Sequence, residues 1–230
     1  MSAKTVIRAH FTAPRIAYMA IFTALAFAVT FLEFPIFPQA NFLKFDFANV
    51  FFLIEGFIFG PVEAIVSIGV KELLCLTKSS TAGVGEIANF IMSTAYVIVP
   101  SVLYRFKKGK WWVTISLVIA CAIQIGVSAL VNRYINFPVF GALYHFDGAE
   151  LFYSLWPFVI YFNIIKSVGI SVVVFFIYKP LSRFIKMTSA KFEKEMEKLK
   201  KERRAEKEAK CAVEPSEEQK EVAVSSDGEN

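Results

Sequence analysis

Long apolar runs separated by short polar breaks dominate the first 185 residues of the chain. A membrane-spanning helix needs about 20 mostly apolar residues to cross a hydrocarbon core of about 30 Å. The pattern therefore predicts an all-α integral membrane protein, folded as a compact bundle of six transmembrane helices. The expected spans are approximately 16–32, 45–59, 62–77, 87–104, 111–131 and 152–178.

The second and third spans are the weak point of this pattern, because each has only about 15 residues. They fit either two short helices in a locally thinned bilayer or a re-entrant hairpin. Six crossings place both termini on one side, together with the basic connection 105–110 and the basic segment 179–186. Cytoplasmic segments carry an excess of Lys and Arg, so both termini are expected in the cytoplasm. A hairpin would spoil this charge pattern, which favours two full spans.

Composition separates a membrane part from a charged tail. The 230 residues are 56% hydrophobic, include 25 Phe and carry a net charge of +5, which membrane orientation explains better than nucleic-acid binding. We expect a cytoplasmic arm 1–15, a six-helix domain 16–185 and a cytoplasmic tail 186–230 that is helical to about residue 210 and then disordered. The three cysteines form no paired framework, and no metal, P-loop or hydrolase motif occurs. Neither a cofactor nor an ATPase module is expected in this chain.

Two polar residues interrupt the last apolar run. Asn163 and Lys166 are three positions apart, so on a helix they share a face. A lysine at the centre of a span costs about 3 kcal/mol, and such residues normally face the bundle interior or a wet cavity. The amide offers a donor and an acceptor and the ammonium offers three donors, which suits the edge of a flat, polar-rimmed heterocycle. Contact between helices, or snorkelling to the interface, is the structural alternative.

Further polar residues and glycines are expected at the outward ends of the spans. A glycine lets the backbone approach a ligand closely. Glu86 also fits a plain role at a helix N-terminus, where a carboxylate is favoured. With Asn163 and Lys166, the candidate ligand-binding residues are Lys44, Phe45, Asp46, Gly83, Gly85, Glu86, Asn89 and Asn132.

The first outer loop is predicted to be stiff and apolar. Its rigidity comes from two prolines and its apolar character from two phenylalanines: Pro35, Phe37, Pro38 and Phe42. Such a loop suits the covering of an aromatic ligand, and it equally suits an ordinary position at the membrane interface.

Two further patterns occupy the first three spans. A stripe of small side chains runs along one face of the first span, formed by Ala17, Ala20, Ala24 and Ala28. Such a face lets another helix approach closely, either within the bundle or from a separate membrane subunit.

The short spans carry four charged residues, Glu55, Glu63, Lys71 and Glu72. We expect internal pairing among them, with proton coupling as the functional alternative.

Three sequence blocks resemble the riboflavin-binding S component of energy-coupling factor (ECF) transporters. They are LKFDF at 43–47, EGFIFGP at 55–61 and SSTAGVGEIANF at 79–90, of which the last is the most specific. The alanine stripe is similar to the family's docking motif for the T component, and Asn163 with Lys166 looks like its ligand-contacting pair. The likeness covers approximately 16–180, and one departure is Ala82, where relatives often have glycine.

The resemblance implies a vitamin-capture subunit. Such a subunit binds riboflavin at the outer face of the bacterial cell membrane, in a deep pocket capped by the first loop. It assembles with a T component and two ATPase subunits, and it topples in the bilayer to release the vitamin inside. Three alternatives remain open from the residues alone. They are the same fold with thiamine, biotin or another solute, an intramembrane enzyme using Glu55, Lys71 and Glu72, and a stand-alone proton-coupled transporter.

Overall fold

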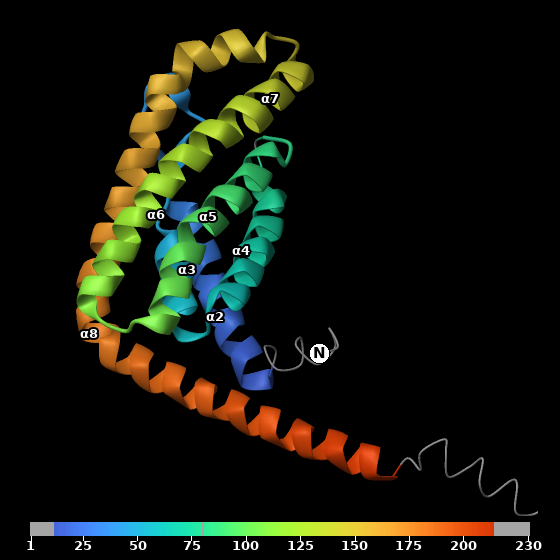
Figure 1. Ribbon diagram of the computed structural model, residues 1–230. Helices are drawn as coiled ribbons and strands as arrows, with labels where there is room; N and C mark the ends of the chain where they lie inside the picture. Colours follow the sequence, from blue (N-terminus) through green and yellow to red (C-terminus); the bar gives the residue numbers. More distant parts are fainter. Residues whose placement is uncertain (1–11, 80, 214–230) are drawn as a thin grey trace, which may run out of the picture. The chain divides into compact units, whose positions relative to one another are not determined.

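The computed structural model describes residues 12–79 and 81–213, and these are mostly helical (Figure 1). The helices are α2 (Ala13–Val29), α3 (Ala48–Ile58), α4 (Pro61–Cys75), α5 (Val84–Phe106), α6 (Lys110–Val131), α7 (Phe137–Tyr144) and α8 (Gly148–Val213). Shorter elements are η1 (Thr30–Leu32), β1 (Phe34–Pro35), η2 (Pro38–Ala40), β2 (Lys44–Phe45), η3 (Leu76–Lys78) and the π-turn η4 (Asn132–Asn136). The bundle lies within 10–189, and the last part of α8 belongs to a separate unit.

Four helical segments in the described part of the chain are long and apolar enough to cross a membrane. They are Ala13–Leu32, Val84–Phe106, Lys110–Tyr144 and Gly148–Lys198. With 11 and 15 residues, α3 and α4 are shorter, about 17 and 23 Å long at the α-helical rise. Every residue of α3 except Phe51 is buried, so protein rather than lipid surrounds most of this short helix.

A tight turn at Gly60 and Pro61 joins α3 to α4. Gly60 has φ +113°, a backbone conformation that side chains rarely allow, and Pro61 begins α4, where its missing N–H is not needed. The packing of α3 against α5 is equally restrictive, because a Cβ at Gly56 would collide with the hydroxyl of Ser101. These two glycines hold α3 close to its neighbours.

The second helix starts later than the apolar run suggested. Phe45, which the sequence placed at the start of the span, pairs instead with Phe34, and the preceding Lys44 pairs with Pro35, in a two-residue antiparallel sheet. The helix α3 begins only at Ala48. Over so short an apolar stretch, hydrophobicity alone does not distinguish a β-strand from a helix.

The sequence assigns residues 132–149, after the fifth span, to a loop, and this prediction was wrong for most of the segment. Helix α6 continues through η4 and α7 without a break as far as Tyr144, which Figure 1 shows as one long rod. Pro138 does not interrupt it, because it lies in the first turn of α7, where proline is tolerated. Phe137 is only 1% exposed, so this extension is anchored by buried apolar contact.

The buried charged residues of the bundle have internal partners. The contacts are Arg15 with Glu63 at 2.8 Å, Lys71 with Glu72 at 2.9 Å, and the Ser67 hydroxyl donating to Glu55 at 2.6 Å. Internal pairing within the expected set is therefore found for Lys71 with Glu72, whereas Glu55 and Glu63 have partners outside that set. Arg15, assigned to the terminal arm, lies in α2 and is 3% exposed.

Beyond the bundle, α8 continues to Val213. The disorder predicted for the end of the tail falls on 214–230, and most of the predicted arm falls on 1–11, both outside the described residues. The division into arm, membrane domain and tail stays a prediction.

Candidate ligand-binding site

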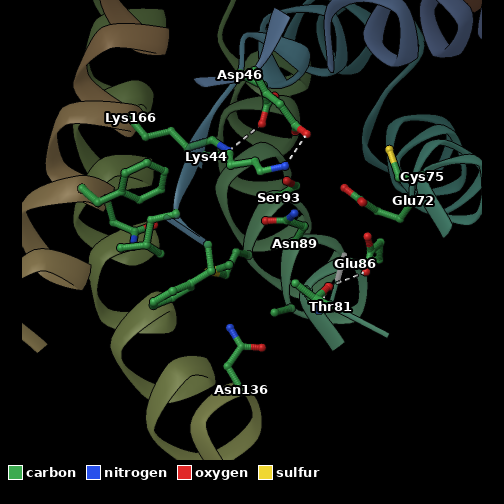
Figure 2. Close-up of a pocket in the computed structure, with 18 of the residues that line it drawn as sticks. Lys44, Asp46, Glu72, Cys75, Thr81, Glu86, Asn89, Ser93, Asn136 and Lys166 are labelled. Carbon is green, nitrogen blue, oxygen red and sulfur yellow. Dashed lines mark hydrogen bonds and ion pairs between the residues drawn. The ribbon is translucent and has the colours of Figure 1, made fainter. Parts of the chain in front are cut away.

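A polar cavity of about 100 Å³ lies inside the bundle, walled by side chains from the first outer loop and from α3, α4, α5, α6 and α8 (Figure 2). Eight of the ten candidate residues line it: Lys44, Asp46, Gly85, Glu86, Asn89, Asn132, Asn163 and Lys166. The other two do not. Phe45 is buried in the apolar cluster beside the cavity, and Gly83 supplies the positive φ of +87° from which α5 starts.

Asn163 and Lys166 face the cavity from α8, on one helix face as expected. They are 2% and 8% exposed, which excludes snorkelling to an interface. The Lys166 ammonium lies 2.8 Å from Asp46 Oδ2. The Asn163 side-chain oxygen accepts a long hydrogen bond of 3.4 Å from Gln124 on α6. The two polar residues therefore connect α8 to the first outer loop and to α6.

Asp46 connects three parts of the wall. One carboxylate oxygen binds Lys166, and the other accepts the N–H of Ala48 at 2.8 Å, which fixes the first turn of α3. Asp46 lies before α3, outside the spanning helices. Burial raises the pKa of its carboxyl, but the Lys166 and Lys71 ammonium groups outweigh burial and bring the pKa down to about 2. Asp46 is therefore charged at neutral pH.

The Ser/Gly loop holds Glu86 in the wall. The Glu86 carboxylate accepts hydrogen bonds from the hydroxyls of Ser79, at 2.9 Å, and Thr81, at 3.1 Å. Ser79 also accepts the N–H groups of Thr81 and Gly83, so one hydroxyl organises the whole loop. Ala82 has φ +53°, a left-handed conformation that costs a residue with a side chain about 1–2 kcal/mol. This explains why a glycine suits that position.

The first outer loop is packed on aromatic side chains of α7 and α8. The ring of Phe42, which lines the cavity, lies 5.7 Å from that of Phe137, and Phe37 lies 5.4 Å from Phe158. Edge-to-face pairs at these distances stabilise beyond simple burial. The loop is thus an ordered cover, and Phe42 is its aromatic residue that lines the cavity.

A partly exposed carboxylate, Glu33, joins the two ends of this cover and links it to η3. Glu33 lies 3.1 Å from the ammonium of Lys44 and 3.4 Å from that of Lys78, and Lys78 also donates to the carbonyl of Thr30 at 2.8 Å. All three charged side chains are partly exposed. Ion pairs of this kind contribute little to stability, about 0–1 kcal/mol, so this contact is easily opened.

Three buried acceptors in the lining have no hydrogen-bond partner within the described structure. They are Glu72 Oε2, Gln124 Oε1 and Asn136 Oδ1. An unsatisfied buried acceptor costs about 1–3 kcal/mol, so a ligand carrying hydroxyl or N–H donors would recover that free energy. This arrangement favours a ligand rich in donors.

The sequence interpretation missed Gln124 and Asn136. Gln124 interrupts the fifth apolar run as Asn163 interrupts the sixth, so the same signal was available. Asn136 is four residues after Asn132 and donates to its side-chain oxygen at 3.0 Å. That spacing places two residues on one face of a helix. The sequence interpretation did not use it, because this segment was assigned to a loop.

Comparison with known proteins decides the family. The family model for the ECF transporter substrate-specific component matches residues 14–178. The chain belongs to this family. The resemblance seen in the sequence is thereby confirmed, and every residue that lines the cavity falls inside the matched region of this S component.

The relatives of this S component are transporter subunits and not enzymes. The riboflavin transporter RibU of Staphylococcus aureus (strain TCH60) is 31% identical over 176 residues, covering 75% of this chain and 92% of the relative. The riboflavin transporter FmnP of Bacillus subtilis (strain 168) is 25% identical, covering 74% and 93%. A solved S component of a bacterial ECF transporter matches with a TM-score of 0.65 and 31% identity, over 75% of this chain and 98% of that one.

The alanine stripe of this S component points out of the bundle. Its four members, Ala17, Ala20, Ala24 and Ala28, are all exposed. The opposite face of α2 carries the buried residues Met19, Thr23 and Ala26. Among the described residues, the stripe therefore does not serve packing within the bundle, which was the structural alternative.

Proposed function

We propose that this S component captures riboflavin and is the substrate-binding subunit of an ATP-driven ECF-type importer. The observation that carries the proposal is the likeness, over nearly their whole length, to relatives named riboflavin transporters. The side chains that line the cavity support it, because they combine aromatic rings with donors and acceptors.

The chemistry of riboflavin suits this lining. Its isoalloxazine rings present flat apolar faces, and Phe42, Phe140 and Phe162 lie in the cavity wall. We assign the uracil-like edge of the ring to Asn163 and Lys166. The ribityl hydroxyls are donors that suit the unpartnered acceptors described above. Glu86, Asn132, Lys44 and Asp46 are further candidates for these hydroxyls.

Binding requires the cavity to widen. Pockets for ligands of this size usually measure about 300–1,000 Å³, whereas this cavity measures about 100 Å³. The contact of Glu33 with Lys44 and Lys78 is the weakest closure around the cavity. We therefore assign vitamin entry to an outward movement of the first outer loop, which breaks this contact.

The proposed arrangement in the bacterial plasma membrane has six spans, with α3 and α4 as the two short ones and both termini in the cytoplasm. The lysines and arginines at the α5–α6 connection and at 179–186 support this orientation. The site then opens outward. The exposed alanine face of α2 is the proposed contact for a T component, which carries two ATPase subunits, since this chain has no ATP-binding motif.

The first test is the absorption spectrum of the detergent-purified protein. Flavin bands in about one-to-one amount, with the released compound identified as riboflavin by mass spectrometry, are the expected result. A colourless protein that also fails to quench the fluorescence of added riboflavin would contradict the proposal. The same fold would then serve another vitamin, such as thiamine or biotin.

A further inference from the structure

A second cavity, separate from the vitamin site, lies in the groove between α6 and α8. Its volume is about 410 Å³, and it shares no lining residue with the polar cavity. The two helices run side by side in Figure 1, and the contact between Cys121 and Ser171 confirms their proximity. The lining residues are Thr114, Leu117, Val118, Cys121, Val168, Ser171, Val172, Phe175 and Phe176.

The groove presents a hydrocarbon surface, because its polar side chains are engaged with the protein. Cys121 Sγ and Ser171 Oγ lie 3.3 Å apart, and Ser171 also bonds to the Tyr96 hydroxyl at 2.7 Å. Thr114 donates to the carbonyl of Lys110 at 3.0 Å. An occupant is therefore apolar along the length of the groove, about 12 Å for the eight steps from Val168 to Phe176.

One end of the groove is basic. The Lys110 ammonium lies 4.7 Å from the ring centroid of Phe175, which forms part of the groove wall. Lys107, three residues earlier, lies 3.9 Å from the ring of Trp112. Within the described residues, neither lysine has a carboxylate at salt-bridge distance. Exposed tryptophans beside lysines are typical of the level of lipid headgroups.

We propose that this groove binds an anionic phospholipid, with an acyl chain between α6 and α8 and the headgroup phosphate at Lys107 and Lys110. An apolar slot ending in uncompensated ammonium groups is complementary to a lipid that joins a hydrocarbon chain to a negative charge. A protein helix in the same place would leave both lysines without an anion. The proposal depends on membrane insertion and is independent of which vitamin the chain carries.

The test is native mass spectrometry of the delipidated full-length protein in detergent, titrated with phosphatidylglycerol or phosphatidylcholine. We expect one phosphatidylglycerol to bind at least tenfold more tightly than phosphatidylcholine. Excess glycerol 3-phosphate, which has the headgroup charge without the chain, should not displace it. Equal affinity for the two lipids, or displacement by the soluble phosphate, would overturn the proposal.

Variants separate the two ends of the proposed site. Lys107→Gln/Lys110→Gln should weaken phosphatidylglycerol binding about 25-fold, about fivefold for each ammonium. Lys198→Gln/Lys201→Gln removes the same charge from the exposed tail helix and should leave the affinity unchanged. An equal loss of phosphatidylglycerol affinity in both variants would show that only the net charge of the protein matters, and it would overturn the proposed site.

The apolar end has its own matched pair. Val172→Trp fills the groove and should prevent binding of both lipids at the one-to-one site, whereas Val66→Trp on the outward face of α4 should not. An unchanged elution volume in gel filtration verifies that each variant is folded. Undiminished phosphatidylglycerol binding in Val172→Trp would place the lipid elsewhere.

Discussion

At the scale of single residues, the ion pair between Lys166 and Asp46 has two roles. It lines the cavity, and it also joins α8 to the segment that starts α3. Removing one partner of a buried pair leaves the other charge uncompensated, which is strongly destabilising. A simple loss of binding after a change at Lys166 would therefore not separate ligand contact from structural support.

A double-mutant comparison separates these roles. Asn163→Ala and Lys166→Met should each weaken riboflavin binding at least tenfold, about 1.4 kcal/mol, as measured by fluorescence quenching. In Asp46→Asn/Lys166→Met both charges are removed, so the structural cost is relieved while the ammonium stays absent. We expect the double variant to regain thermal stability and still to bind weakly. Recovery of wild-type affinity would assign Lys166 a purely structural role.

At the scale of elements, α2 has two distinct faces. One is buried and includes Arg15, which pairs with Glu63 on α4; the other carries the exposed alanine stripe. A change on the outer face therefore need not disturb the bundle. This permits a test of assembly that leaves the ligand site intact.

Ala20→Trp and Ala24→Trp should each abolish riboflavin uptake in cells that supply the partner subunits, because a large ring prevents close approach of a second helix. Riboflavin binding by the purified variants should stay unchanged. Leu25→Trp is the control, since it is exposed on the same helix but lies about 100° around from Ala24. Normal uptake with tryptophan in the stripe would show that no partner docks there.

The sequence predicted the helical class, and eight of its ten candidate residues line the cavity. Polar residues are unfavourable within apolar runs, so their presence there indicates a site inside the bundle. Asn163 and Lys166 are the clearest cases. It did not predict that Glu63 pairs with Arg15, since that contact joins residues 48 positions apart in the chain. Such pairings depend on how helices are arranged, which periodicity within one helix does not specify.

The extension of α6 was missed for a local reason. Asn132, Asn136 and Pro138 have the composition of a turn, which favours a loop at this position. In the structure, the amides bond to each other or to the helix, and the proline occupies a first-turn position. Burial of Phe137 outweighs weak local preferences.

At the scale of the whole molecule, the cavity and the separate unit at the end of α8 draw on different parts of the chain. All lining residues lie between Glu33 and Lys166. The ligand site should therefore be independent of the charged tail.

Removal of residues 199–230 tests this independence. The truncated protein should bind riboflavin within about twofold of the full chain, because none of the described residues beyond Lys166 lines the cavity. Fluorescence titration of the two proteins in the same detergent provides the measurement. A tenfold weaker affinity in the truncated protein would mean that the tail supports the site.

Each of the two cavities has one cysteine in its lining, so the reactivity of that thiol can report whether the cavity is filled. Cys75 lies in the wall of the polar cavity, and Cys121 lies in the lining of the groove between α6 and α8. Neither is in a disulfide. A thiol-alkylating reagent followed by peptide mapping would thus report the filling of each compartment separately, in one sample and without an added label. The native chain therefore contains two cysteines whose alkylation measures whether each cavity is filled.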